Sequence, residues 1–221
     1  MNPSLLFHLT LSVSGFFAAT LAGADNLQDV CPTALPNPGR QPLFINGFPC
    51  KNPADVAASD FKTNKLNLPG DMDPRIRSAV SMSTAADFPG LNTLGISVAR
   101  TDVAAGGIVL PHYHPRASEM MFVSKGSVRV GFVDSGGQAF GKLVREGEVF
   151  VFPRGLIHYC YNGDNEAVTA FSVLNSQNPG VYDILGGAFG FGAGLQEEED
   201  IKRMMMNLSM GSNLNETAAG F

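Results

Sequence analysis

Residues 106–126 read GGIVLPHYHPRASEMMFVSKG, and residues 147–162 read GEVFVFPRGLIHYCYN. Both stretches are short apolar runs punctuated by glycine and proline, and both contain histidine. Residues two apart in a β-strand point to the same face, so His112 and His114 can present their imidazoles to one point in space. Glu119 follows five residues later, where the next strand begins, and His158 lies on a later strand. The interior of a β-barrel could bring these four side chains together.

The four side chains form a candidate metal site. Apart from His8, every histidine of the chain belongs to this set. Zinc accepts three imidazoles and a carboxylate as a closed tetrahedron, whereas Mn(II) or Fe(II) completes six-coordination with two waters and leaves room for a substrate. The residues therefore predict a bound metal ion, and their spacing leaves the choice of metal open.

The region around these residues is rich in short segments of β character. We expect strands near residues 94–103, 119–124, 127–133, 139–144, 148–152, 157–162 and 166–174, with turns between them. Many short strands at this spacing are typical of an antiparallel sandwich or barrel. A helix is predicted only near the C-terminus, from Gln196 to Asn207, after the glycine-rich residues 186–194.

Composition and the first residues narrow the class of protein. The net charge of -5 and the pI near 5.3 argue against nucleic acid as the main partner, because phosphate binding needs a basic face. Residues 1–24 are mostly apolar and end in Ala22-Gly23-Ala24, which predicts a cleaved secretory signal rather than an uncleaved membrane anchor. No later segment is long and apolar enough to span a bilayer, so we expect a soluble mature chain from about Asp25 onward.

The three cysteines fit an exported protein. Cys31 and Cys50 flank a short stretch rich in turn residues, which suggests a disulfide in an oxidising compartment. Closing such a loop contributes about 3 kcal/mol in the chain-entropy model. Cys160 is expected to be a buried free thiol, with a metal ligand or an intermolecular bridge as the alternatives. Asn207 and Asn215 begin sequons for N-glycosylation.

These motifs resemble those of the germins and germin-like proteins of the cupin superfamily. The first germin box is matched in spacing by Gly106, His112, His114, Glu119 and Gly126. The second is matched by Gly147, Pro153, Gly155, His158 and Asn162. Residues 28–31 and 46–51 are similar to the N-terminal cysteine segments of the family. The resemblance covers nearly all of the mature chain.

The resemblance implies an all-β fold, a cupin jelly-roll barrel over residues 61–178. A disulfide-tied extension over residues 25–60 precedes the barrel, and a glycine-rich and helical segment over residues 179–221 follows it. The resemblance also implies Mn(II) on His112, His114, Glu119 and His158, and a disulfide between Cys31 and Cys50. Members of the family are typically glycosylated homo-oligomers of the plant apoplast, often hexamers built as trimers of dimers.

The resemblance also bears on activity. The cereal germins are oxalate oxidases, and their substrate dianion is assisted by asparagines near the metal. One asparagine matches Asn92, but the other position, three residues before His112, is Val109 here. A missing polar contact to a charged substrate in a buried site costs a few kcal/mol, so we expect weak or absent oxalate oxidase activity. Asn162 is expected either to support the metal site through a hydrogen bond or to hold a turn.

Two other functions remain open from the sequence. Superoxide dismutation needs a metal that changes oxidation state and an open position for a small anion, and it does not need the missing asparagine. Some relatives have this activity. The alternative is a non-enzymatic protein of the cell wall, active in defence or development, or a binder of a small acid such as auxin.

Overall fold

The computed structural model describes residues 29–34 and 47–184. The predicted signal, the predicted helix from Gln196 to Asn207 and both glycosylation sequons lie outside these described residues. Within them, no helix is both long and apolar enough to cross a membrane.

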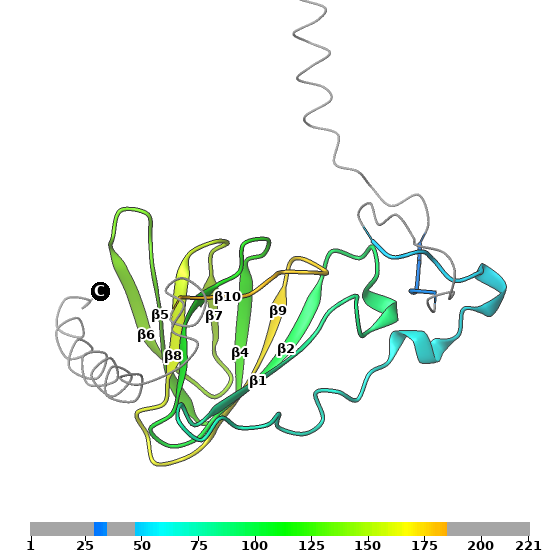
Figure 1. Cartoon of the computed structure of the whole chain (residues 1–221). Helices are drawn as coiled ribbons and strands as arrows, with labels where there is room; N and C mark the ends of the chain where they lie inside the picture. The colour runs from blue at the N-terminus through cyan, green and yellow to red at the C-terminus, as the bar shows by residue number, and fades with distance from the viewer. Residues whose placement is uncertain (1–28, 35–46, 185–221) are drawn as a thin grey trace, which may run out of the picture.

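The described residues form two five-stranded antiparallel sheets that pack against each other (Figure 1). The first sheet has the order β1 (Ser78–Ser83), β2 (Ser97–Val103), β9 (Val168–Leu174), β4 (Glu119–Lys125) and β7 (Val149–Phe152). The second has the order β10 (Tyr182–Asp183), β3 (Ile108–Tyr113), β8 (Ile157–Tyr161), β5 (Ser127–Val133) and β6 (Ala139–Arg145). This is the antiparallel double-sheet barrel that the strand pattern predicts, in the jelly-roll form that the resemblance implies.

The period-two pattern of the strands explains the two sheets. Along β9, Val168, Ala170, Ser172 and Leu174 are buried, and the residues between them are more exposed. Along β8, His158 and Cys160 are the buried pair. Such alternation places one face of each strand in the core and turns the other outward.

The core between the sheets is built mainly from valine. Its buried members are Val103, Met121, Val123, Val128, Val130, Val144, Phe152, Cys160, Val168 and Ala170, from strands of both sheets. Met121, Phe152 and Cys160 also line the cavity described below. The core is therefore continuous with the floor of the functional site. Cys160 is buried and free, as predicted.

The seven predicted strands are present, most of them with shifted ends, and three further strands, β1, β3 and β10, lie outside the predicted ranges. The segment that forms β1 reads SAVSMS, where serine weakens the alternation, and β10 has only two residues. β3 carries His112, and His114 follows it directly. β3 pairs with β8 through Ile108↔Tyr161 and His112↔His158, with a register shift between them. Because β10 joins the second sheet, the barrel extends past residue 178.

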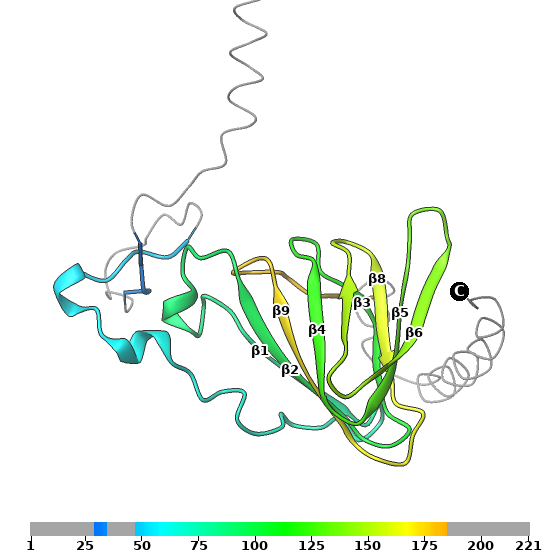
Figure 2. The same cartoon turned by 180° about the vertical axis from the view of Figure 1, so that it is seen from behind.

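The described part of the N-terminal extension lies to one side of the barrel, seen from opposite directions in Figures 1 and 2. The predicted Cys31–Cys50 disulfide is present, with 4.8 Å between the two Cα atoms. Three short 3₁₀ helices belong to this side of the molecule, η1 (Pro53–Asp55), η2 (Ala58–Phe61) and η3 (Pro89–Leu91). The Thr33 amide donates to the Pro89 carbonyl at 3.2 Å, which ties the extension to the residues before β2.

Candidate metal centre

His112, His114, Glu119 and His158 converge at one point between the two sheets. One ligand atom from each side chain lies within 4.8 Å of the ligand atoms of the others. His112 is on β3, His114 follows directly after that strand, and His158 is on β8 of the same sheet. Glu119 is the first residue of β4 in the opposite sheet. The cluster thus joins both halves of the barrel.

Strand pairing explains the arrangement of the imidazoles. His112 and His158 are direct partners in the antiparallel β3–β8 pair, and their ring centroids are 4.3 Å apart. The His114 ring lies 5.2 Å from each of the other two. Phe152 stacks on His158 with 4.5 Å between ring centroids, which restrains that ring from the other side.

Each histidine is oriented by a backbone carbonyl. The Nδ1 atoms of His112 and His158 lie 2.8 Å from the carbonyl oxygens of Leu110 and Leu156. The Nδ1 atom of His114 lies 2.6 Å from the carbonyl oxygen of Gly180. Because a carbonyl oxygen only accepts, each Nδ1 carries the hydrogen. In the neutral rings, the lone pair is then on Nε2, the nitrogen available to a metal.

A buried nitrogen without a partner supports the fit to a metal ion. His158 Nε2 is buried and makes no hydrogen bond, and the nearest Glu119 oxygen is 3.5 Å away. A buried polar atom without a partner is costly, and a cation at this point would satisfy it. Three imidazoles and one carboxylate form a ligand set that divalent transition metals accept. The residues present therefore fit a metal ion.

The charges of the free site also suit metal binding. Burial acts to raise the pKa of Glu119, but the hydrogen bond with His114 and the proximity of His158 and of the Ser172 hydroxyl outweigh it, so the pKa is well below its usual value. Burial, followed by repulsion from His158, lowers the pKa of His112 to about 4. Around neutral pH, the site therefore offers a carboxylate and a neutral His112 to a cation.

Acid is expected to weaken metal binding through His114. Burial acts to lower the pKa of His114, but its hydrogen bonds to Glu119 and to the Gly180 carbonyl outweigh this effect and raise the pKa. His114 must lose its Nε2 proton to bind a metal, so affinity falls by about tenfold per pH unit below that pKa and levels off above it. Calorimetric titration of the metal-free protein with Mn(II) between about pH 5 and 8 measures the slope. An affinity for Mn(II) that does not change over this range would contradict the assignment of an Nε2 proton to His114 beside Glu119.

The carbonyl of Gly180 is a site feature that sequence reasoning missed. Arg116 holds the segment that carries it, because its Nε donates to the Asn178 carbonyl at 2.7 Å and its backbone amide donates to the Pro179 carbonyl at 3.1 Å. β10 then pairs with β3, placing Asp183 opposite His112. The only sequence signal was Pro179-Gly180 itself, which predicts a break in the chain and nothing about a ligand.

Asn92, expected near the metal, and Asn162, for which a turn role was the alternative, both bind backbone groups away from the metal cluster. Asn92 is fully buried, and its side chain binds the backbone of Cys31 and Phe48. Asn162 is also fully buried, and its Nδ2 donates to the carbonyls of Val103 and Glu166, at 3.0 and 2.8 Å. Neither asparagine lines the cavity at the metal site. Asn162 therefore holds the turn after β8, and Asn92 anchors the extension.

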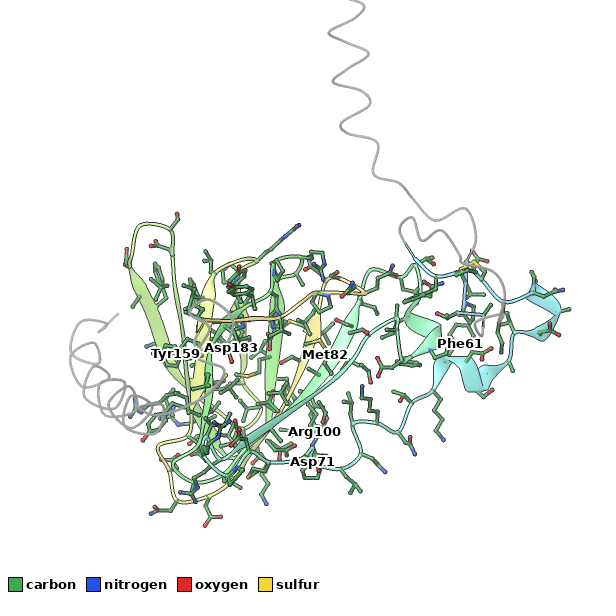
Figure 3. The ribbon with its side chains drawn as sticks, in the orientation of Figure 1. Phe61, Asp71, Met82, Arg100, Tyr159 and Asp183 are labelled. Atoms are coloured by element: carbon green, nitrogen blue, oxygen red, sulfur yellow. A yellow bond between two sulfur atoms is a disulfide. The ribbon has the colours of Figure 1, made fainter. Side chains whose placement is uncertain are left out.

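A cavity of about 370 Å³ opens beside the cluster. Its walls come from both sheets, and Met82 of β1 and Asp183 of β10, labelled in Figure 3, are two of the residues that line it. Val109, at the position where the cereal germins are expected to have asparagine, also lines it. Val109 therefore contributes an apolar side chain to the wall of the metal cavity.

A two-sheet barrel around three histidines and a glutamate defines a cupin, and residues 65–206 match the family model described as Cupin. "Germin-like protein subfamily 3 member 4" of Arabidopsis thaliana is 48% identical over 212 residues, covering 96% of this chain and 97% of the relative. "Germin-like protein 11-1" of Oryza sativa subsp. japonica is 55% identical over 190 residues, covering 86% of this chain and 85% of the relative. The chain therefore belongs to the germin-like proteins.

A solved structure supports the same assignment. Recombinant oxalate oxidase in complex with glycolate superposes with a TM-score of 0.70 at 34% identity, covering 89% of this chain and 98% of that chain. The match shows that the described barrel shares the fold of this oxalate oxidase.

Proposed function

We propose that this chain is a secreted manganese protein that dismutates superoxide at His112, His114, Glu119 and His158. The observation that carries the proposal is the oriented cluster itself, with an unpartnered buried His158 Nε2 at its centre and a cavity beside it. The mixed nitrogen and oxygen set suits Mn(II), and the adjoining cavity gives a small anion access to it.

In this chemistry, the protein holds the metal ion, orients the side chains that bind it and admits a small anion to it. Bound manganese supplies one-electron exchange between Mn(II) and Mn(III), by which two superoxide ions and two protons become one O₂ and one H₂O₂. The carbonyls of Leu110, Leu156 and Gly180 fix the three rings. Glu119 offsets one positive charge of the metal, and Phe152 closes the floor next to His158.

Oxalate is a poor match to the same cavity. Val109 and Ala99 line it, and among the described lining residues no lysine, arginine or asparagine is present. A dianion would therefore meet the metal as its one cationic partner, while Asp183 lines the same space. We propose that oxalate oxidase activity is weak or absent, although a solved relative is an oxalate oxidase.

The activity is tested on manganese-loaded protein beside a Glu119→Gln variant, with bound manganese measured in each. The wild-type protein is expected to dismutate superoxide, and the variant to lose at least about tenfold of that activity as the metal site weakens. Glu146, which is exposed on the surface, provides the matched control as Glu146→Gln. Equal activity in all three proteins would rule out this site as the source. High turnover of oxalate by the same preparation would overturn the proposal on oxalate.

We also propose where the protein is located and how it is modified. Residues 1–24 have the pattern of a secretory signal, and the Cys31–Cys50 disulfide fits an oxidising compartment. We propose secretion to the plant apoplast, N-glycosylation at Asn207 and Asn215, and a role in defence or development.

A homo-oligomer, a trimer of dimers, is proposed from the resemblance. An exposed apolar patch on the outer face of the first sheet supports self-association, since such patches mark interaction surfaces. Its members are Met120, Phe122, Val149, Val151 and Val173, each between 43% and 52% exposed.

A further inference from the structure

We propose that Ser172 is a positioning residue of the metal site, whose hydroxyl donates a hydrogen bond to the Glu119 carboxylate and holds it in the orientation that binds the metal. The inference rests on the metal site of the proposed function. It adds a residue that lies outside the four-residue cluster, does not line the cavity and acts through Glu119.

The register of the first sheet places Ser172 diagonally opposite Glu119. Glu119 pairs with Leu174 of β9. Two residues further along β4, Met121 pairs with Ser172. Paired residues point to the same side of a sheet, and diagonal neighbours on one face are within reach of a long side chain. Ser172 belongs to the buried face of β9, and Glu119 meets the histidines from the same side of the sheet. The two side chains are therefore neighbours.

The Ser172 hydroxyl is buried without a hydrogen-bond partner among the described residues. The residue is 1% exposed, and its cross-strand partners, Met121 and Ala99, have no oxygen or nitrogen in their side chains. Ser97, a diagonal neighbour on β2, also has a buried Oγ atom without a partner, so the two serines are not bonded to each other. A buried hydroxyl without a partner is costly, and Glu119 is the anionic acceptor beside it.

Metal binding gives the Glu119 carboxylate a need for this donor. Its Oε2 atom accepts from His114 Nε2 at 2.9 Å. Once His114 Nε2 binds a metal ion, that nitrogen carries no hydrogen and can no longer donate. The Ser172 hydroxyl is close enough to contribute to the low pKa of Glu119, where burial acts in the opposite direction and the hydrogen bond with His114 acts in the same one. A hydrogen bond to a metal-binding carboxylate fixes its orientation.

The affinity of the full-length protein for Mn(II), measured by competition with a chelator of known strength, tests this role. Ser172→Ala is expected to weaken binding by about tenfold, and Ser172→Thr, which keeps the hydroxyl, is expected to stay within about threefold of the wild-type affinity. Ser97→Ala is the matched control, because Ser97 is also 1% exposed with an unpartnered Oγ atom, and Leu174 separates it from Glu119 in the sheet. Unchanged affinity in Ser172→Ala, or equal losses in both alanine variants, would overturn the inference.

Two further measurements separate positioning from a purely structural role. Without metal, Ser172→Ala is expected to unfold at a urea concentration no lower than the wild-type protein, because alanine removes a buried hydroxyl that has no partner. In a Glu119→Ala background, Ser172→Ala is expected to change the Mn(II) affinity by less than about twofold, because no carboxylate remains to be oriented. The same tenfold loss in that background would show that Ser172 does not act through Glu119, and a clear fall in the urea midpoint would assign it a structural role instead.

The outcome also distinguishes this inference from the proposed function. Manganese content and superoxide dismutation are measured on the same preparations. If manganese binds and superoxide is consumed while Ser172→Ala binds manganese as tightly as the wild-type protein, the inference alone is wrong. If manganese binding depends on Ser172 but superoxide is not consumed, the proposed function alone is wrong. If the protein does not take up manganese, both fail.

Discussion

Replacing Glu119 with glutamine is expected to lower the affinity for Mn(II) by at least about a hundredfold, equivalent to about 2.8 kcal/mol of binding free energy. Glu119 is the one anionic member of the cluster, and its side chain is 11% exposed. Glutamine preserves the shape of the side chain and removes its charge. In a site shielded from water, a charged ligand contributes far more to the free energy of metal binding than it would on the protein surface.

The affinity is measured by competition with a chelator of known strength, at a pH where His114 is deprotonated. Glu146→Gln removes an exposed carboxylate from the turn between β6 and β7 and is expected to leave the affinity unchanged. Retention of the wild-type affinity within about threefold in Glu119→Gln would show that the carboxylate is not a metal ligand.

Replacing Asn92 with alanine is expected to lower the free energy of unfolding by about 3 kcal/mol, with metal affinity unchanged. The Asn92 Nδ2 donates to the carbonyls of Cys31 and Phe48, at 2.9 and 2.8 Å. The Oδ1 atom accepts from the Phe48 amide at 2.9 Å. Alanine would leave these backbone groups without a partner beside the disulfide, and buried groups of this kind are costly.

Urea unfolding at one fixed protein concentration, with the disulfide intact, measures the loss of stability. Asn67→Ala, at an exposed asparagine, is the control and is expected to shift stability by less than about 0.5 kcal/mol. A variant that keeps its stability but loses metal affinity would contradict the role in the structure. It would restore the interpretation that Asn92 supports the metal site.

The clustering of the metal ligands could be predicted because three of the four lie close together in the sequence, on segments where the strand period determines which face a side chain occupies. His112 and His114 share a face by the two-residue period of a strand, and Glu119 begins the following strand. The second stretch adds His158, and only a barrel interior joins the two stretches. The short strands predicted an antiparallel sandwich or barrel, and the resemblance implied the cupin jelly roll. The disulfide was predicted from the turn-rich stretch that Cys31 and Cys50 flank.

The features that escaped prediction depend on contacts between distant parts of the chain. The Gly180 carbonyl reaches His114 across 66 residues, and a backbone oxygen leaves no trace in residue type. Asn92 binds Cys31 across 61 residues, a contact that the sequence does not reveal, and the family resemblance implied a role near the metal instead. Val80 and Met82 lie in a serine-rich segment whose weak alternation hid the strand that lines the cavity.

Anomalous diffraction from crystals of the natively purified protein, recorded on both sides of the manganese absorption edge, tests the metal site most directly. We expect one anomalous peak per chain that appears only above the edge, in contact with the Nε2 atoms of His112, His114 and His158 and with the Glu119 carboxylate. A peak at another place, a different metal at this position, or a His158 ring turned away from the other two histidines would contradict the assignment.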